Sequence, residues 1–362
     1  MGADLVPALD PAPIPGPPGL LVVLWVVTFF LHLLFVNAAL GGAIFSAILP
    51  AALKPAARRP AALFLAEVSS WAISLAVTFA IAPLLFLQTL YGRFFYTATV
   101  FVAPVWLALL VLLMAAYYLN WAAKFRLKAG KSADLPIALS AVLLVAVAAI
   151  QVAVYLIQVQ PALWSAYAAR PSLVLFDPAY LPRLLHFVLA AVSMAAILPA
   201  AFPRAGEPGP GEAARFGLFV ALVATGAQFA VGLWLLGVLP SGVLRGLMTG
   251  GAAKLAPLAA GVLVGVALLG LLVRAVAAPG NVRLARVALA HLVAAAAFMV
   301  VTRHQLRDLY LAAARANERL VVATQWNVLA LFLAVFVLCA GLTIWALVRA
   351  ATDRPGPGET AA

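Results

Sequence analysis

Long apolar runs, separated by short polar segments, fill almost the whole chain. About nine of them reach the roughly 20 residues that a helix needs to cross a bilayer. They lie near 20–49, 61–90, 97–123, 135–163, 180–202, 214–239, 255–278, 283–303 and 322–349. Backbone groups in lipid must bond within their own segment, so these runs are helices rather than strands. The pattern predicts an all-α integral membrane protein with about nine transmembrane helices.

The composition agrees with a lipid environment and argues against a soluble fold. Hydrophobic residues make up 66% of the chain and charged residues 9%, whereas a soluble domain carries about 25% charged residues. The net charge of +12 is spread over short loops without a basic patch, so no nucleic-acid partner is expected. The single cysteine, Cys339, excludes an intrachain disulfide, and no CxxCH site for covalent haem attachment is present.

The distribution of lysine and arginine predicts the orientation. If the N-terminus lies outside, most of the 23 basic residues fall in inner loops and the C-terminal tail, as the positive-inside rule requires. We therefore expect the N-terminus outside and the C-terminus inside. The chain then divides into a Pro-rich outer segment (1–19), one transmembrane domain (20–349) and a cytoplasmic tail (350–362).

The four histidines, His32, His186, His291 and His304, all lie in or at the edge of the apolar runs. Ionisable side chains in a membrane are costly and therefore candidates for function, and helical bundles hold haem through axial histidines. A histidine bonded to a neighbouring carbonyl is the structural alternative. Because His32, His186 and His304 can share the outer half of the bundle, we expect them to bind haem iron. His291 points about 140° away from His304 on their shared helix, so we expect it to be structural.

Two arginines, Arg303 and Arg307, flank His304. Guanidinium groups pair with carboxylates in a bidentate geometry, so both are candidates to neutralise haem propionates. Basic residues at an outer helix end are otherwise ordinary.

Three segments resemble the large subunit of cytochrome bd quinol oxidases. LHLLFVNAALGGAIFSAIL (31–49) is similar to the family's first helix, which implies that His32 binds the oxygen-reactive haem. SLVLFDPAYLPRLLHFVLAAVSMAA (172–196) resembles the fifth helix, with His186 as haem ligand and Arg183 one turn before it. HQLRDLY (304–310) fits the eighth helix, with His304 in place of a glutamate ligand and Arg307 keeping an arginine.

The chain departs from that family where protons and quinol are handled. The family's third helix carries two glutamates, and this chain has Ala108 and Ala116 there. Alanine cannot relay the protons that oxygen reduction consumes. The family's methionine ligand falls near Ala256, and the candidate substitute, Met248, is out of register. The family's long quinol loop is reduced to the short segment 240–254.

The resemblance implies a b-type haem subunit, with two or three haems and a quinone as a further candidate ligand. It would pass electrons between the quinone pool and a partner near the outer face of a bacterial-type inner membrane. That partner would be a second membrane subunit or a c-type cytochrome, and oxygen would not be reduced. Two alternatives stay open, a working bd-like quinol:oxygen oxidoreductase and a haem-free transporter or membrane anchor.

Overall fold

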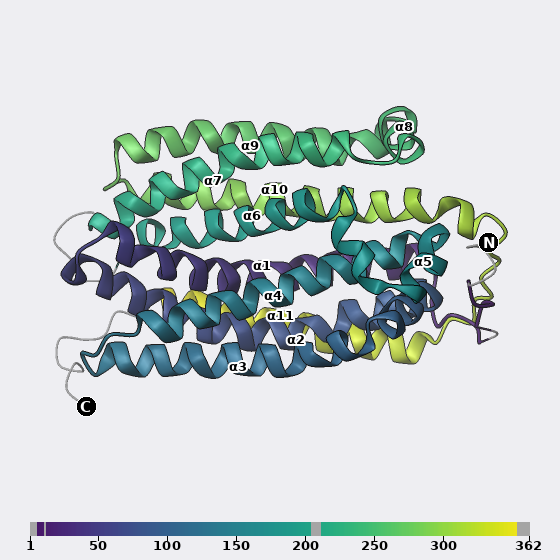
Figure 1. The fold of residues 1–362 in the computed structure, drawn as a ribbon, viewed down its shortest axis with the longest axis horizontal. Coiled ribbons are helices and arrows are strands. Elements are labelled where there is room, and N and C mark those ends of the chain that lie inside the picture. The colour runs from purple at the N-terminus through teal and green to yellow at the C-terminus, as the bar shows by residue number, and fades with distance from the viewer. Residues whose placement is uncertain (1–5, 11, 204–210, 353–362) are drawn as a thin grey trace.

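The computed structural model describes residues 6–10, 12–203 and 211–352. Among these residues, nine helices are long and apolar enough to span a membrane, which confirms the expected all-α membrane fold. They pack side by side in one elongated bundle (Figure 1). The nine are α1 (Pro18–Ala52), α2 (Pro55–Phe101), α3 (Ala103–Lys128), α4 (Asp134–Val159), α6 (Tyr180–Ala201), α7 (Glu212–Gly237), α9 (Ala252–Ala277), α10 (Val282–Arg315) and α11 (Trp326–Thr352). Part of the expected outer segment (1–5 and 11) and most of the expected tail (353–362) lie outside the described residues.

Large apolar side chains cover the outside of this bundle. On α3, for example, Leu107 is 64% exposed and Leu110 is 67% exposed. Soluble proteins rarely expose apolar patches larger than a few hundred Å², whereas lipid solvates such a surface at no cost. The bundle surface is therefore built for a bilayer.

Several helices extend beyond the apolar runs that predict them. Helix α2 continues from Pro55 to Phe101 through a kink at Tyr91 (φ −137°, ψ 24°), although the apolar run ends near residue 90. Helix α10 continues to Arg315, past the expected end near 303. Hydropathy measures the length in lipid, but a helix continues until its backbone hydrogen bonds are interrupted. The extended part of α10 carries His304 and Arg307.

Glycines bring α1, α6 and α7 into close contact in the half of the bundle away from the N-terminus. A Cβ atom on Gly41 would lie 1.8 Å from the carbonyl oxygen of Ala191 on α6. One on Gly217 would lie 2.2 Å from the carbonyl oxygen of Ala196. Such small residues let helix backbones approach closely, which is how membrane helices pack without a hydrophobic driving force. These crossings fix the position of α6 between α1 and α7.

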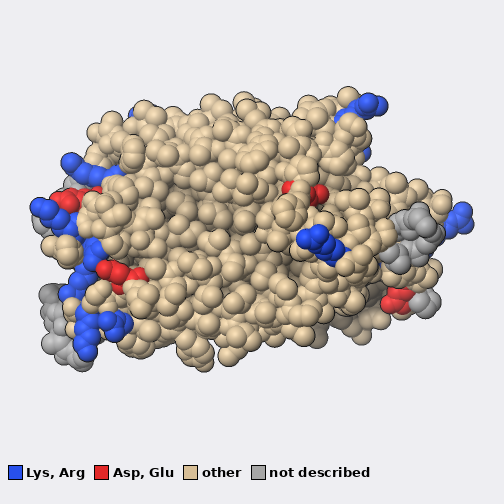
Figure 2. Space-filling view, viewed as in Figure 1, with Lys and Arg blue, Asp and Glu red and all other residues tan. Residues whose placement is uncertain are grey.

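The two ends of the bundle differ in charge. Lysine and arginine gather at the end where α1 meets α2 and α3 meets α4, which we call the basic end (Figure 2). The other end, which we call the N-terminal end, holds the start of α1, the end of α10 and the short helices α5 (Trp164–Ala169) and α8 (Ser241–Thr249). This asymmetry is the pattern from which the N-out orientation is predicted.

Folded segments close the N-terminal end. The chain before α1 pairs with the α10–α11 linker, because the Ile14 amide donates to the Val321 carbonyl at 2.8 Å and the Ala323 amide donates to the Ile14 carbonyl at 3.0 Å. Beside them, the Tyr167 hydroxyl donates to Gln160 Oε1 at 2.9 Å, and burial raises the pKa of Tyr167. The phenol therefore stays protonated and keeps this hydrogen bond.

Candidate functional site

An aromatic face of α1 leads into the N-terminal half of the bundle. Trp25, Phe29 and His32 follow one another at helical spacing and so lie on one face. The rings of Trp25 and Phe29 stack at 5.6 Å between centroids, and those of Phe29 and His32 are 6.1 Å apart. Helix α10 places His304 edge-on against Trp25 at 5.2 Å. Two of the three predicted haem ligands, His32 and His304, thus contact one continuous aromatic wall.

Three arginines converge on a single tyrosine, Tyr155 of α4. The guanidinium carbons of Arg183, Arg303 and Arg307 lie 4.7, 4.4 and 5.4 Å from its ring centroid. Tyr155 is 4% exposed. The structure therefore brings together the three arginines predicted as cofactor-binding residues, from helices α6 and α10. We call Arg183, Arg303 and Arg307 the arginine cluster.

No ion pair is formed by the arginine cluster among the described residues, although Arg307 is buried and Arg183 and Arg303 are partly buried. Arg307 is 2% exposed, and its Nε and Nη1 atoms have no hydrogen-bond partner among the described residues. The same holds for Nε and Nη2 of Arg183. In the described part of the chain, no carboxylate lies within ion-pair distance of any of the three guanidinium groups. Cation–π contacts are worth about 0.5–2 kcal/mol each, but they leave these donors unpaired, and an unpaired buried donor costs about 1–3 kcal/mol.

His32 bonds a carbonyl of a neighbouring helix, which is the contact of the structural alternative and which leaves its other ring nitrogen open to a ligand. Its Nδ1 lies 2.8 Å from the carbonyl oxygen of Ala76 on α2. A carbonyl can only accept, so Nδ1 carries the proton and donates it to this bond. The lone pair is then on Nε2, which has no hydrogen-bond partner among the described residues. Metal-ligating histidines almost always fix their second ring nitrogen in this way.

His186 and His304 also keep one ring nitrogen free. The Nδ1 atom of His186 is buried without a partner, and its ring faces Gly232 on α7, where an added Cβ would lie 3.5 Å from the His186 Cε1 atom. His304 is 9% exposed. Its Nε2 lies 3.4 Å from Asp308 Oδ2, and its Nδ1 has no partner among the described residues. Each of the three histidines can therefore still donate one lone pair.

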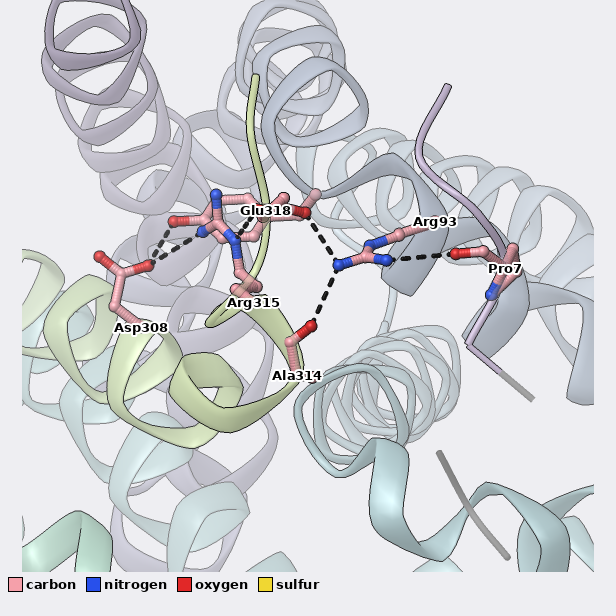
Figure 3. A network of polar contacts seen from close by, with 7 residues as sticks. Pro7, Arg93, Asp308, Ala314, Arg315 and Glu318 are labelled. Carbon is pink, nitrogen blue, oxygen red and sulfur yellow. Dashed lines mark hydrogen bonds and ion pairs between the residues drawn. The ribbon is translucent and has the colours of Figure 1, made fainter. Parts of the chain in front are cut away.

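A network of ion pairs joins α10 to α2 at the N-terminal end (Figure 3). Asp308 accepts a hydrogen bond of 2.6 Å from the Tyr91 hydroxyl and lies 3.7 Å from Arg315. Arg315 also pairs with Glu318, and Glu318 pairs with Arg93 at 3.0 Å. Two backbone carbonyls, those of Pro7 and Ala314, accept hydrogen bonds from the Nη1 and Nη2 atoms of Arg93. The nearby carboxylates are thus engaged here and leave the arginine cluster without an anion.

The remaining predicted residues lie apart from this site. Met248 sits on the short helix α8 and is 40% exposed, without a described contact to His186. His291 donates its Nδ1 proton to the Val287 carbonyl one turn earlier, at 2.8 Å. This bond within a single helix is of the kind expected for a structural histidine.

Sequence reasoning missed five residues of the site, among them Phe29, which lies one turn before His32. Trp25 lies two turns before His32, and Asp308 lies one turn after His304, so helical spacing from the histidines could have found both. Tyr91 and Tyr155 come from α2 and α4, and no local pattern marks them. They are brought in by the packing of the bundle.

The kinds of donor at this site match those that a b-type haem would need. Haem iron takes one or two axial nitrogen donors, and its two carboxylates need cations or other donors. The free histidine nitrogens and the arginine cluster supply both kinds of group. Among the described residues, no group of three or more histidine, cysteine or acidic side chains could hold a bare metal ion.

Comparison of the chain with known protein families, curated proteins and solved structures finds no match. The resemblance to the cytochrome bd large subunit remains a prediction from the segments around His32, His186 and His304. A function for this site therefore has to be argued from the contacts of its own residues.

Proposed function

We propose that the chain is a membrane electron-transfer subunit that binds b-type haem at its N-terminal end. The observation that carries the proposal is the arginine cluster, in which Arg183 and Arg307 keep buried nitrogen atoms without hydrogen-bond partners. The cluster lies near histidines that each keep one ring nitrogen free. A ligand that supplies both a metal for the histidines and carboxylates for the arginines satisfies both halves of the site. Haem is such a ligand.

The energetics of the arginine cluster favour an anionic ligand. An uncompensated buried charge costs several kcal/mol even after relaxation. Like charges gathered on Tyr155 add repulsion, which is stronger inside a protein than in water. Two carboxylates from one ligand would neutralise two of the three guanidinium groups and accept hydrogen bonds from the unpaired donors on Arg183 and Arg307. The cost of burial is then offset by charge-assisted hydrogen bonds.

Each side chain has a distinct part in this proposal. His32 would hold the iron through Nε2 while the Ala76 carbonyl keeps its ring in place. His186 and His304 would supply further axial nitrogens, as the sequence predicts. The bound haem would supply reversible one-electron transfer. The arginine cluster would favour the reduced state, because positive charge near a redox centre stabilises the added electron.

The proposed electron path joins the quinone pool to a partner near the outer face, either a second membrane subunit or a c-type cytochrome. It follows the N-out orientation predicted for a bacterial-type inner membrane. Oxygen reduction is not part of the proposal, because α3 contains no Asp or Glu along its length and Ala116 is completely buried. Helix α3 therefore has no carboxylate to store a proton for oxygen reduction.

The main alternative is a haem-free transporter or membrane anchor. In its favour, the two cavities described in the structure lie at the basic end, away from the histidines. A second alternative, a working quinol:oxygen oxidoreductase, keeps the haem and adds oxygen uptake.

Haem content in matched histidine variants tests the proposal. The full-length protein, His32→Ala and His291→Ala would be purified, and haem measured as the pyridine haemochrome. We expect His32→Ala to lose a haem and His291→Ala to retain the native amount, since His291 bonds only within its own helix. Equal haem content in all three proteins would show that His32 is not a haem ligand. Quinol-driven oxygen uptake by the native protein would favour the alternative of a quinol:oxygen oxidoreductase.

A further inference from the structure

A cavity of about 250 Å³ opens at the basic end, away from the haem site. It lies between the end of α1, the start of α2 and the turn from α3 to α4. Water occupies about 30 Å³ per molecule in the liquid, so the cavity is large enough for a polyatomic group. The polar residues that line it include Ser46, Arg58, Arg59, Lys131 and Asp134.

The lining of this cavity carries an excess of positive charge. Asp134 is the only acidic residue in the lining, and it pairs with Arg58 at 2.9 Å between Oδ2 and Nη2. Arg59 donates to a neutral partner, the Leu127 carbonyl, at 2.8 Å. Lys131 has no acidic partner among the described residues. Two positive charges at the cavity are therefore not neutralised.

Backbone and hydroxyl groups add to this preference for an anion. Helices α2 and α4 both begin at the cavity, and the N-cap residue of neither forms a side-chain hydrogen bond. In α4 the Asp134 amide donates to the Ser132 hydroxyl at 3.4 Å. The partial positive ends of two helix dipoles thus face the same space. Ser46 is 4% exposed and lines the cavity, and its hydroxyl has no hydrogen-bond partner among the described residues. The Ser46 hydroxyl can donate to or accept from a polar group in the cavity.

The turn between α3 and α4 is shaped around Arg59. Gly130 adopts φ +79°, a left-handed conformation that favours glycine at helix C-termini. An added Cβ at this position would lie 3.2 Å from Arg59 Nη2. The glycine therefore lets the turn close over the guanidinium group and holds it at the cavity.

We propose that this cavity binds the phosphate group of an anionic phospholipid. Polar and cationic groups line it at the end of the bundle where lipid headgroups lie, and apolar side chains such as Leu49 and Ile137 line the same cavity. This combination suits an amphiphile, whose phosphate contacts Arg59, Lys131 and Ser46 while its glycerol and acyl parts contact the apolar wall. Basic pockets between membrane helices bind such headgroups in general.

The site is tested by lipid binding to the delipidated full-length protein. Native mass spectrometry would measure the Kd for phosphatidylglycerol, for phosphatidylcholine of the same acyl chains, and for inorganic phosphate. The variants are Lys131→Gln and Ser46→Ala. The control, Lys254→Gln, removes an exposed lysine at the N-terminal end and so makes the same change in net charge.

We expect native protein and Lys254→Gln to bind phosphatidylglycerol more tightly than phosphatidylcholine. Lys131→Gln should bind phosphatidylglycerol about tenfold more weakly, because one charge-assisted hydrogen bond is lost. Ser46→Ala should weaken binding less, since the lost bond comes from a neutral hydroxyl. If inorganic phosphate displaces the lipid, the cavity is an anion-binding site whose ligand is free phosphate rather than a phospholipid. Equal binding of the two lipids, or equal weakening in Lys254→Gln, would overturn the proposal; haem content enters neither result.

Discussion

Replacement of Arg307 by methionine should have opposite effects on the haem-free and the haem-loaded protein. Arg307 is 2% exposed, and its guanidinium lies 4.8, 5.1 and 5.4 Å from the rings of Trp25, Tyr91 and Tyr155. Methionine of similar length loses these contacts, at about 0.5–2 kcal/mol each. It also removes two unpaired donors, at about 1–3 kcal/mol each, and a buried charge without a partner. Replacing buried ionic groups by apolar side chains is often neutral or stabilising by about 1–4 kcal/mol.

These contributions nearly cancel, so the free energy of unfolding of the haem-free variant should differ from that of the haem-free native protein by no more than about 2 kcal/mol. Haem binding should weaken about 10- to 100-fold, because a charge-assisted hydrogen bond of about 1.5–3 kcal/mol is lost. Thermal unfolding in detergent measures the first quantity, and haem titration measures the second. Arg245→Met, on the exposed face of α8, is the control. If Arg307→Met destabilises the haem-free protein by about 3–5 kcal/mol, as loss of one partner from a satisfied buried pair does, the arginine cluster is structural and needs no anion.

Three further substitutions test the surrounding structure. Gly41→Ala should lower the thermal unfolding temperature, because its Cβ would lie 1.8 Å from the Ala191 carbonyl oxygen and overpacking costs about 1–3 kcal/mol. Gly226→Ala, where nothing lies within 4 Å, should not lower it. Tyr91→Phe removes the 2.6 Å hydrogen bond to a carboxylate and should reduce the unfolding free energy by about 1.5–3 kcal/mol; an unchanged value would mean that water replaces the bond. Arg93→Gln removes an ion pair and two hydrogen bonds to backbone carbonyls. Limited proteolysis of the segment before α1 should therefore become faster. An unchanged rate would show that the pairing of Ile14 with the α10–α11 linker is enough to hold this segment in place.

The sequence predicts the membrane-spanning helices well because the energetics there depend on single residues and their immediate neighbours. The free energy of transferring apolar side chains to lipid is nearly additive, so each apolar run of about 20 residues can be recognised from the sequence. The helix ends are less predictable, as the continuation of α10 to Arg315 shows. Polar residues beyond the lipid still form helix where other segments bury them, and this burial depends on the fold.

The candidate site could be predicted only in part for the same reason. Arg303, Arg307 and His304 are neighbours on one helix, so their proximity follows from helical spacing. Their convergence with Arg183 on Tyr155 depends on how α4, α6 and α10 pack. No local pattern in the chain specifies that packing. The lack of an ion pair to these arginines among the described residues, on which the proposed function rests, is likewise a property of the folded bundle.

The most direct test of the account is a reduced-minus-oxidised optical spectrum of the purified native protein, with pyridine haemochrome quantitation. The account predicts the absorption bands of b-type haem, at about two to three haems per chain if His32, His186 and His304 all act as ligands. Well-folded protein without haem absorption, prepared from cells supplied with haem, would contradict it. The haem-free transporter or membrane anchor would then become the leading interpretation.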